Sequence, residues 1–267
     1  MKKLMKKLGL VLTTVAIAVT TVFGLTACGG NDNKLVVATE AKFNPFEYVD
    51  SNGNYTGFDM ELIELLAKKM GYDGVIIKDM EFDSVVGAVT TKNADVAIAA
   101  MTINAKRAKS VDFSDAYYTD SAQWILKKKG DTKFVGTTKE ALDQELVGKK
   151  IGVAKGQTGY YYVLGGGDFE FAGVKDAKMS EYQDMPSAVT ALKKGMVDCV
   201  LSDNAVAEEI IANNPDIEAI KVPLTVEAYG IAVKKGNTEM VNKLNAALKE
   251  AKTDGSFDKI YNKYFGE

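Results

Sequence analysis

Arg107 is the side chain with the most specific chemistry in this sequence, because it is the only arginine among 33 basic residues. A guanidinium holds a carboxylate through two parallel hydrogen bonds, whereas a lysine ammonium acts as a point charge. Arg107 follows an apolar run that ends at Ala99 and Ala100, and the loop before it offers the hydroxyl of Thr102. An ordinary surface role is the alternative for a single arginine, but this position favours a carboxylate-binding loop.

Other kinds of site are excluded by composition. The sequence contains no histidine, the side chain that most often serves as a general base or metal ligand. A Ser-His-Asp triad and zinc chemistry are therefore ruled out, and we expect neither a metal nor a cofactor. Of the two cysteines, Cys199 lies in an apolar stretch and is interpreted as a small buried side chain. Because the thiol of Cys28 is expected to carry a lipid, no intramolecular disulfide is expected in the mature chain.

The first 27 residues have the pattern of a lipoprotein signal peptide. Four lysines precede an uncharged apolar run over residues 8–25, which closes on the sequence LTAC at Cys28. This pattern predicts that residues 1–27 are removed and that Cys28 is lipidated, which anchors the protein to the outer side of the cell membrane. An uncleaved membrane span is the alternative. The abundance of Thr, Ala and Gly and the lack of a basic stop-transfer flank disfavour it.

The net charge argues against a nucleic-acid partner. Removal of the signal takes away four lysines and no acid, which moves the formal charge from -3 to -7. An acidic chain with dispersed lysines lacks the basic stripe that phosphate contacts require. We therefore expect no binding to nucleic acid.

The elements that must position Arg107 alternate between short β-branched runs and helical periodicities, which is typical of an α/β fold. Predicted strands cover residues 34–39, 75–77, 96–99, 151–154, 199–201 and 229–233. Predicted helices cover residues 59–70, 84–92 with an Asp or Ser cap, 186–194 and 238–252, and another begins near Tyr160. A weak internal likeness joins Ala94–Ile98 to Val197–Leu201, since both follow a helix and a turn and carry an Asp before an apolar strand. It suggests two lobes of similar build.

The chain is expected to cross twice between these lobes. The predicted parts are a tether at residues 28–33, one lobe at 34–117 plus 229–267, the other lobe at 118–228, and hinge segments near 117–121 and 222–228. Open α/β sheets bind ligands beyond the carboxyl ends of their strands. Two such lobes facing each other would therefore form a ligand cleft.

Two segments resemble a known family. Residues 57–62, GFDMEL, continuing to Met70, fit the signature of the polar amino-acid binding proteins of ABC importers, solute-binding family 3. Ala100 to Thr102 with Arg107, followed by residues 111–118, resembles the carboxylate-binding loop and first hinge of that family. The resemblance extends from about residue 35 to residue 265. It implies a type II periplasmic-binding-protein-like fold, a monomer with one amino-acid ligand, and an ABC permease as partner.

The resemblance also implies site residues, which are most similar to those of glutamine-binding members. Glu40 stands where those members have an aspartate beside an aromatic residue, here Phe43, and Phe82 is the second aromatic side chain over the ligand. The implied set is Glu40, Phe43, Phe82, Ala100, Thr102, Arg107, Lys155, Thr158, Gly159 and Asp203. Each phenylalanine has a plain alternative as core, and Glu40 and Lys155 have one as solvated surface charges.

These residues also suit an amino acid on physical grounds. A zwitterion needs a cation for its carboxylate and an anion for its ammonium, and Arg107 and Asp203 lie on opposite predicted lobes. Glu40 can accept from a side-chain amide NH2 while Lys155 donates to its C=O, which favours glutamine. If Lys155 turns to solvent instead, the pocket is acidic and arginine, or another polar amino acid, is the next expectation.

An enzyme is the main alternative to a receptor. The sequence is also similar to exported cyclohexadienyl dehydratases of the same fold, in which Glu40 could protonate a leaving hydroxyl. Such an enzyme has no use for an ammonium-binding acid at Asp203, so a binding protein is favoured. A ligand-sensing domain of a larger receptor is disfavoured because no membrane span or signalling domain follows up to Glu267.

Overall fold

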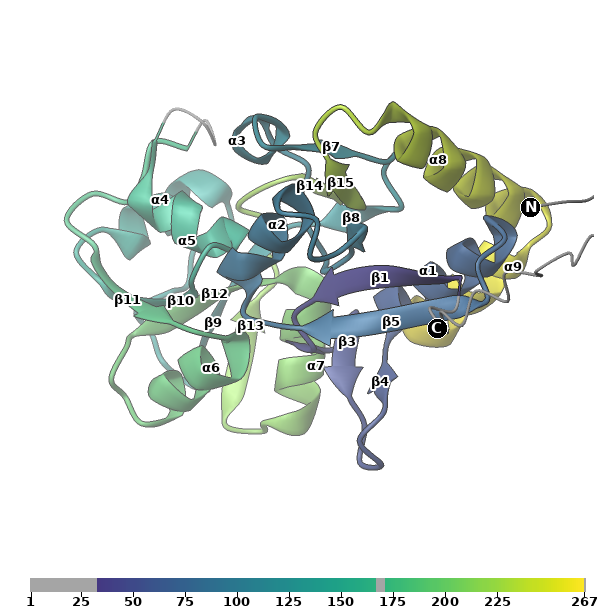
Figure 1. The fold of residues 1–267 in the computed structure, drawn as a ribbon. Coiled ribbons are helices and arrows are strands. Elements are labelled where there is room, and N and C mark those ends of the chain that lie inside the picture. Colours follow the sequence, from purple (N-terminus) through teal and green to yellow (C-terminus); the bar gives the residue numbers. More distant parts are fainter. Residues whose placement is uncertain (1–32, 167–170, 267) are drawn as a thin grey trace, which may run out of the picture. The chain divides into compact units, whose positions relative to one another are not determined.

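Two five-stranded sheets dominate the computed structural model, which describes residues 33–166 and 171–266 (Figure 1). The sheet that contains β1 (Lys34–Thr39), with its helices, is called the first lobe, and the other sheet with its helices the second lobe. The predicted two-lobed α/β fold is confirmed. The predictions for the signal peptide, Cys28 and most of the tether lie outside the described residues.

The first lobe is built around parallel strands. Its sheet has the order β5 (Gly74–Asp79), β1, β6 (Val96–Ala97), β15 (Ala232–Lys234) and β7 (Val111–Phe113). β1 pairs in parallel with β5 and β6, whereas β15 pairs antiparallel with β6 and β7. Its helices are α1 (Phe58–Lys69), α2 (Phe82–Thr90), α3 (Ala105–Ala108), α8 (Thr238–Thr253) and α9 (Ser256–Phe265).

The second lobe repeats this plan. Its sheet has the order β11 (Lys178–Tyr182), β10 (Lys150–Ala154), β12 (Cys199–Asp203), β9 (Gln123–Lys128) and β13 (Ile217–Ile220). Its helices are α4 (Lys139–Leu146), α5 (Thr158–Leu164), α6 (Met185–Lys193) and α7 (Asn204–Asn213). Cys199 is buried in β12 as predicted, and burial raises the pKa of its thiol.

The internal likeness seen in the sequence has a structural counterpart. Asp95 precedes β6, and its carboxylate accepts the backbone N–H of Val36 in the neighbouring strand β1. Asp198 precedes β12, and its carboxylate accepts the backbone N–H of Lys150 in the neighbouring strand β10. In each lobe an aspartate at the strand entrance therefore binds the parallel strand beside it.

Two short strands connect the lobes. β8 (Tyr118–Ser121) and β14 (Glu227–Tyr229) pair antiparallel in a sheet of their own. Tyr118 and Tyr229 stack on each other and both pack against Phe46, which anchors the pair to the first lobe. Phe46 precedes β3 (Glu47–Val49), which lies between β2 (Lys42–Phe43) and β4 (Tyr55–Thr56) in a small three-stranded sheet. The predicted lobe boundaries and hinge segments stay predictions.

Helix α1 shows why the strongest sequence pattern was reliable. Its buried face consists of apolar residues at helical spacing, including Leu62, Ile63 and Leu66. Acidic residues stand in its first turn and lysines in its last, which suits the helix dipole. The helix ends just before Gly71, whose φ of 87° is unfavourable for other residues. The predicted helix at 59–70 is thus displaced by only one residue.

Two predictions were wrong in detail. The strand expected at 229–233 is two strands, β14 and β15, because the chain turns from one sheet to the other at Gly230 and Ile231. A Cβ at Gly230 would lie 2.8 Å from the side chain of Ile103, so a larger residue there would require Ile103 to move. Helix α2 begins at Phe82, earlier than expected. Its N-cap is Glu81 and not the expected Asp or Ser, and the Glu81 side chain makes no capping hydrogen bond.

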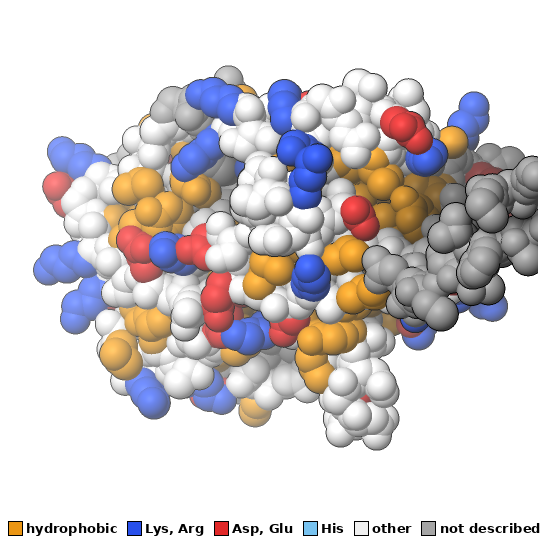
Figure 2. All heavy atoms as spheres, viewed as in Figure 1, with side chains coloured by type: hydrophobic (Ala, Val, Ile, Leu, Met, Phe, Trp, Pro, Cys, Tyr) orange, Lys and Arg blue, Asp and Glu red, His pale blue; other side chains and the backbone are white. Residues whose placement is uncertain are grey.

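Charges of both signs are interspersed on the face seen in Figure 2, with apolar side chains between them. Among the described residues, no helix has the length and apolar composition needed to cross a membrane.

Candidate functional site

A small cavity lies between the two lobes. The space between its walls is about 210 Å³, solvent at its opening included, and it is lined by Phe43, Phe82, Ala99, Ala100, Thr102, Arg107, Gln157, Thr158 and Asp203. The first six belong to the first lobe and the last three to the second. Seven of the ten predicted site residues therefore come together here, although the prediction that they bind a ligand stays a prediction.

Arg107 is held rigidly at one side of this cavity. It lies in α3, whose N-cap Asn104 accepts the backbone N–H of Arg107, and it is only 8% exposed. Its guanidinium donates to the carbonyl of Thr102 at 2.7 Å and, across the lobes, to the carbonyl of Gly156 at 3.0 Å. The ring of Phe82 lies 5.1 Å from the guanidinium carbon. Burial lowers the pKa of Arg107 to about 10, so the group remains cationic at neutral pH.

Asp203 supplies the opposite charge from the second lobe. It ends β12, and its carboxylate accepts hydrogen bonds from the Gln123 amide and the Tyr229 hydroxyl, with Ser121 at 3.4 Å. Burial raises the pKa of Asp203 to about 7, and the nearby carboxylate of Glu227 adds to this rise. An ammonium group beside Asp203 would offset both effects, because it favours the ionised form.

Hydroxyl groups lie between these two charges. The hydroxyl of Thr102 is 3.0 Å from that of Thr158, which begins α5 in the other lobe. Thr102 also donates to the carboxylate of Glu227 at 2.6 Å. The cavity is therefore lined by a cation, an anion and two hydroxyls, which together can bind a carboxylate and an ammonium.

Glu40 stands behind the lining of the cavity. It is 2% exposed, and one carboxylate oxygen accepts from the Gln157 amide at 3.3 Å. Its other oxygen has no hydrogen-bond partner within the described part of the chain. Burial, aided by the charges of Asp184 and Glu81, raises the pKa of Glu40 to about 8. Glu40 thus reaches the cavity through Gln157, and one of its oxygens is left for a further donor.

Lys155 and Gly159 are not brought into the cavity. The Lys155 ammonium lies 2.9 Å from the Asp83 carboxylate, and its side chain is 55% exposed. Gly159 packs against β12, where a Cβ would lie 2.8 Å from the amide oxygen of Gln123. The predicted opposing pair of Glu40 and Lys155 is therefore not assembled around one side chain.

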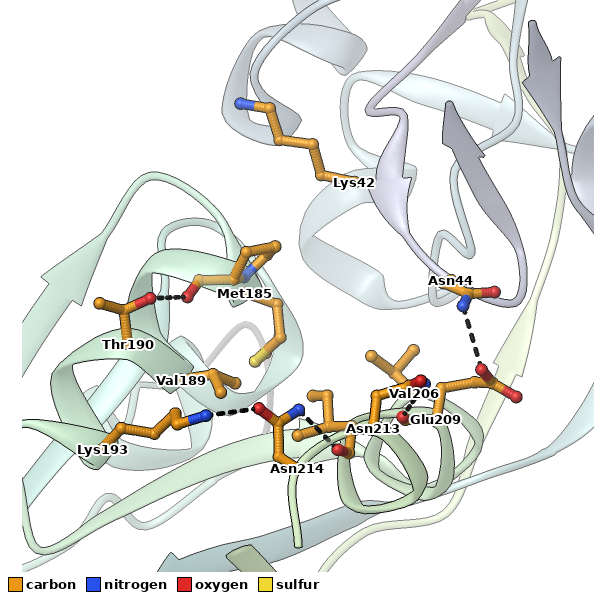
Figure 3. Close-up of a pocket in the computed structure, with 12 residues that line it drawn as sticks. Lys42, Asn44, Met185, Val189, Thr190, Lys193, Val206, Glu209, Asn213 and Asn214 are labelled. Atoms are coloured by element: carbon orange, nitrogen blue, oxygen red, sulfur yellow. Dashed lines mark hydrogen bonds between the residues drawn. The ribbon is translucent and has the colours of Figure 1, made fainter. Parts of the chain in front are cut away.

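A larger hollow nearby is a weaker candidate for the amino-acid site. It lies between the segment around Lys42 and Asn44 and helices α6 and α7, and has about 780 Å³ of space that is partly open to solvent. Figure 3 shows the Asn44 amide pointing at the Glu209 carboxylate, to which it donates at 3.0 Å. Lys42 is paired with Asp184 at 2.9 Å. The lining of this hollow includes no arginine. The polar pairs Asn44–Glu209 and Lys42–Asp184 already bond to each other across the lobes.

Sequence reasoning missed two residues that line the cavity, Ala99 and Gln157. It also missed Gln123, Glu227 and Tyr229, which hydrogen-bond to the lining residues Asp203 and Thr102. Gln157 lies in the same loop as the predicted site residue Lys155. Glu227 lies in the extended run interpreted as the second crossing. Their positions alone could have suggested Gln157 and Glu227 as site residues. Gln123 carried no local signal, because its role depends on the pairing of β9 with β12.

The comparisons with known proteins agree with this geometry. The family model of bacterial extracellular solute-binding proteins, family 3, matches residues 35–267. A probable histidine-binding protein of Neisseria gonorrhoeae is 35% identical over 91% of each chain. The arginine-binding extracellular protein ArtP of Bacillus subtilis is 31% identical over 98% of each chain.

Solved structures give the same result. An ancestral arginine-binding protein, solved bound to glutamine and bound to arginine, is 41% identical to this chain. The match covers 88% of this chain and 99% of that chain, with TM-scores of 0.77 and 0.78 respectively.

The relatives are binding proteins and the fold has two lobes, so the chain is a two-lobed binding protein rather than an enzyme. The chain belongs to the bacterial extracellular solute-binding proteins of family 3, and within it to the amino-acid-binding components of ABC transporters.

Replacement of Arg107 by lysine should weaken amino-acid binding by about 2 kcal/mol or more, because a point charge replaces a bidentate fork. Isothermal titration calorimetry of Arg107→Lys against the wild type measures this change. Lys106→Arg, on the same short helix, is the matched control and should retain wild-type affinity. Equal affinities of Arg107→Lys and the wild type would remove Arg107 from the ligand site.

Proposed function

We propose that this protein is the lipid-anchored receptor of an amino-acid ABC importer and that it prefers an amino acid with a cationic side chain, arginine first. On this proposal the ligand carboxylate binds Arg107 and its ammonium binds Asp203. Because these residues come from different lobes, one ligand can hold both lobes together. The closed receptor would then present the ligand to the permease.

The preference rests on the carboxylate of Glu40. It is buried next to the cavity with one oxygen unpartnered among the described residues, and the basic group expected to oppose it, Lys155, is paired with Asp83. The sequence favours glutamine only if Lys155 donates to the ligand amide. Without that donor, the side-chain end of the site is acidic, and a cationic group gains most from it.

Glutamine remains the second candidate for a specific reason. The ancestral arginine-binding protein, at 41% identity, has been solved with either amino acid bound. A protonated Glu40 can also donate a hydrogen bond to an amide oxygen, and its raised pKa favours the protonated form at neutral pH. The two ligands therefore differ in the protonation state of Glu40 that they select.

This difference predicts a pH-dependent preference. Since the pKa of Glu40 is about 8 without ligand, arginine must displace a proton from Glu40 at pH 7, whereas glutamine need not. The ratio of the glutamine to the arginine dissociation constant should therefore rise with pH, by up to about tenfold per unit between pH 6.5 and 8. Asp203 and Arg107 bind groups common to both ligands, so their contributions to the two dissociation constants cancel in this ratio.

The measurement is a competition titration of both amino acids across this pH range. Glu40→Gln should flatten the ratio, and the control Lys155→Gln should leave the wild-type profile unchanged. Tighter binding of glutamine at every pH would refute the preference for arginine. An altered profile for Lys155→Gln would return that lysine to the pocket and favour glutamine.

The lipid anchor gives a separate prediction. Cys28→Ala should yield a receptor with unchanged ligand affinity that no longer fractionates with membranes, because no acyl group is attached. Cell fractionation followed by a binding titration tests both parts, and Cys199→Ala is the control that should remain with the membranes. Mature Cys28→Ala protein found in the membrane fraction would contradict the anchor.

A further inference from the structure

Glu227 is a buried carboxylate at the point where the lobes are joined. It begins β14, one of the two connecting strands, and is 5% exposed. One of its oxygens accepts from Thr102 at 2.6 Å. The other accepts from Thr225 at 2.7 Å and from the amide of Gln123 at 3.2 Å. A buried carboxylate with three such donors is well satisfied and firmly placed.

The three donors belong to three different parts of the molecule. Thr102 lines the cavity from the first lobe. Gln123 begins β9 of the second lobe, and the same amide that reaches Glu227 also donates to Asp203. Thr225 lies in the connection itself, and its hydroxyl accepts the backbone N–H of Gln123 at 2.8 Å. One carboxylate therefore fixes a residue of each lobe and the segment between them.

We propose that Glu227 is a positioning residue for the ligand: it orients Thr102 towards the amino-acid main chain, holds the Gln123 amide that donates to Asp203, and couples both to the connection between the lobes. The proposal rests on the proposed amino-acid binding at Arg107 and Asp203. Glu227 does not line the cavity, so its effect reaches the ligand through its partners.

The charge of Glu227 also acts on Asp203. After burial, the Glu227 carboxylate is the largest cause of the raised pKa of Asp203. The groups that face or lie near Asp203 are Tyr229 and Glu227 of β14, Ser121 and Tyr118 of β8, Gln123 of β9, Arg107 of α3 and Glu47 of β3. Removal of the Glu227 charge should therefore let Asp203 ionise at lower pH, because like-charge repulsion is relieved.

The test compares Glu227→Gln with the wild type by calorimetric titration of arginine and glutamine. Binding of both should be about tenfold weaker at pH 8.5, because the neutral amide is a weaker acceptor for Thr102. Below pH 7, Glu40, whose pKa is about 8, is already mostly protonated, so a further change in glutamine binding there reports on Asp203. Wild-type affinity should decrease below pH 7 with a midpoint that moves to lower pH in Glu227→Gln.

Glu218→Gln, which changes a half-buried glutamate of β13 that is paired with Lys127, is the control and should change neither quantity. Thermal denaturation of all three proteins separates folding from binding. A lower melting temperature with unchanged affinity and midpoint would make Glu227 a stabilising residue only and overturn the proposal. If the wild type binds neither amino acid, the proposed function itself fails, which is a distinct result.

Discussion

Everything at this site follows from the cost of burying two opposite charges in a closed cleft. Arg107 and Asp203 lose their hydration when the lobes meet, and an unpaired buried charge is strongly unfavourable. Without ligand, the guanidinium is satisfied by the carbonyls of Thr102 and Gly156, and Asp203 by the donors Gln123 and Tyr229. These partners are dipoles or weak acids, whereas a zwitterion offers each group a full opposite charge. On the proposed function this gain is available only when both lobes contact one ligand, which would link binding to closure.

The fold places these charges by using one arrangement twice. In both lobes an aspartate before a strand binds the backbone of the parallel strand beside it, Asp95 in the first and Asp198 in the second. The ligand-facing groups lie where such strands end, in the loop after β6 and at the end of β12. The lobes are joined by β8 and β14, which also carry Ser121, Glu227 and Tyr229 into the polar network. The connecting strands and the proposed binding site therefore share one hydrogen-bond network. A ligand bound there could change the relative orientation of the lobes.

The sequence allowed the architecture to be predicted more fully than the specificity. Helix α1 was found within one residue because its apolar face repeats at helical spacing, and Arg107 because its chemistry is unique in the chain. The split at Gly230 was missed, since the packing of Ile103 against it depends on contacts between distant segments. The same holds for Lys155, whose partner Asp83 belongs to the other lobe. Gln123 and Glu227 acquire their roles only through strand pairing, so local sequence could not reveal them.

The central claim is that Arg107 and Asp203 hold the two ends of a zwitterion, and ligand analogues test it most directly on the unmodified protein. Agmatine is arginine without its carboxylate, and Nα-acetylarginine is arginine without its ammonium charge. Calorimetric titration at pH 8 should find each at least about a hundredfold weaker than arginine, because each leaves one buried charge without its partner. Agmatine or Nα-acetylarginine binding as tightly as arginine would show that the main-chain charges are not what the protein recognises, and would contradict this account.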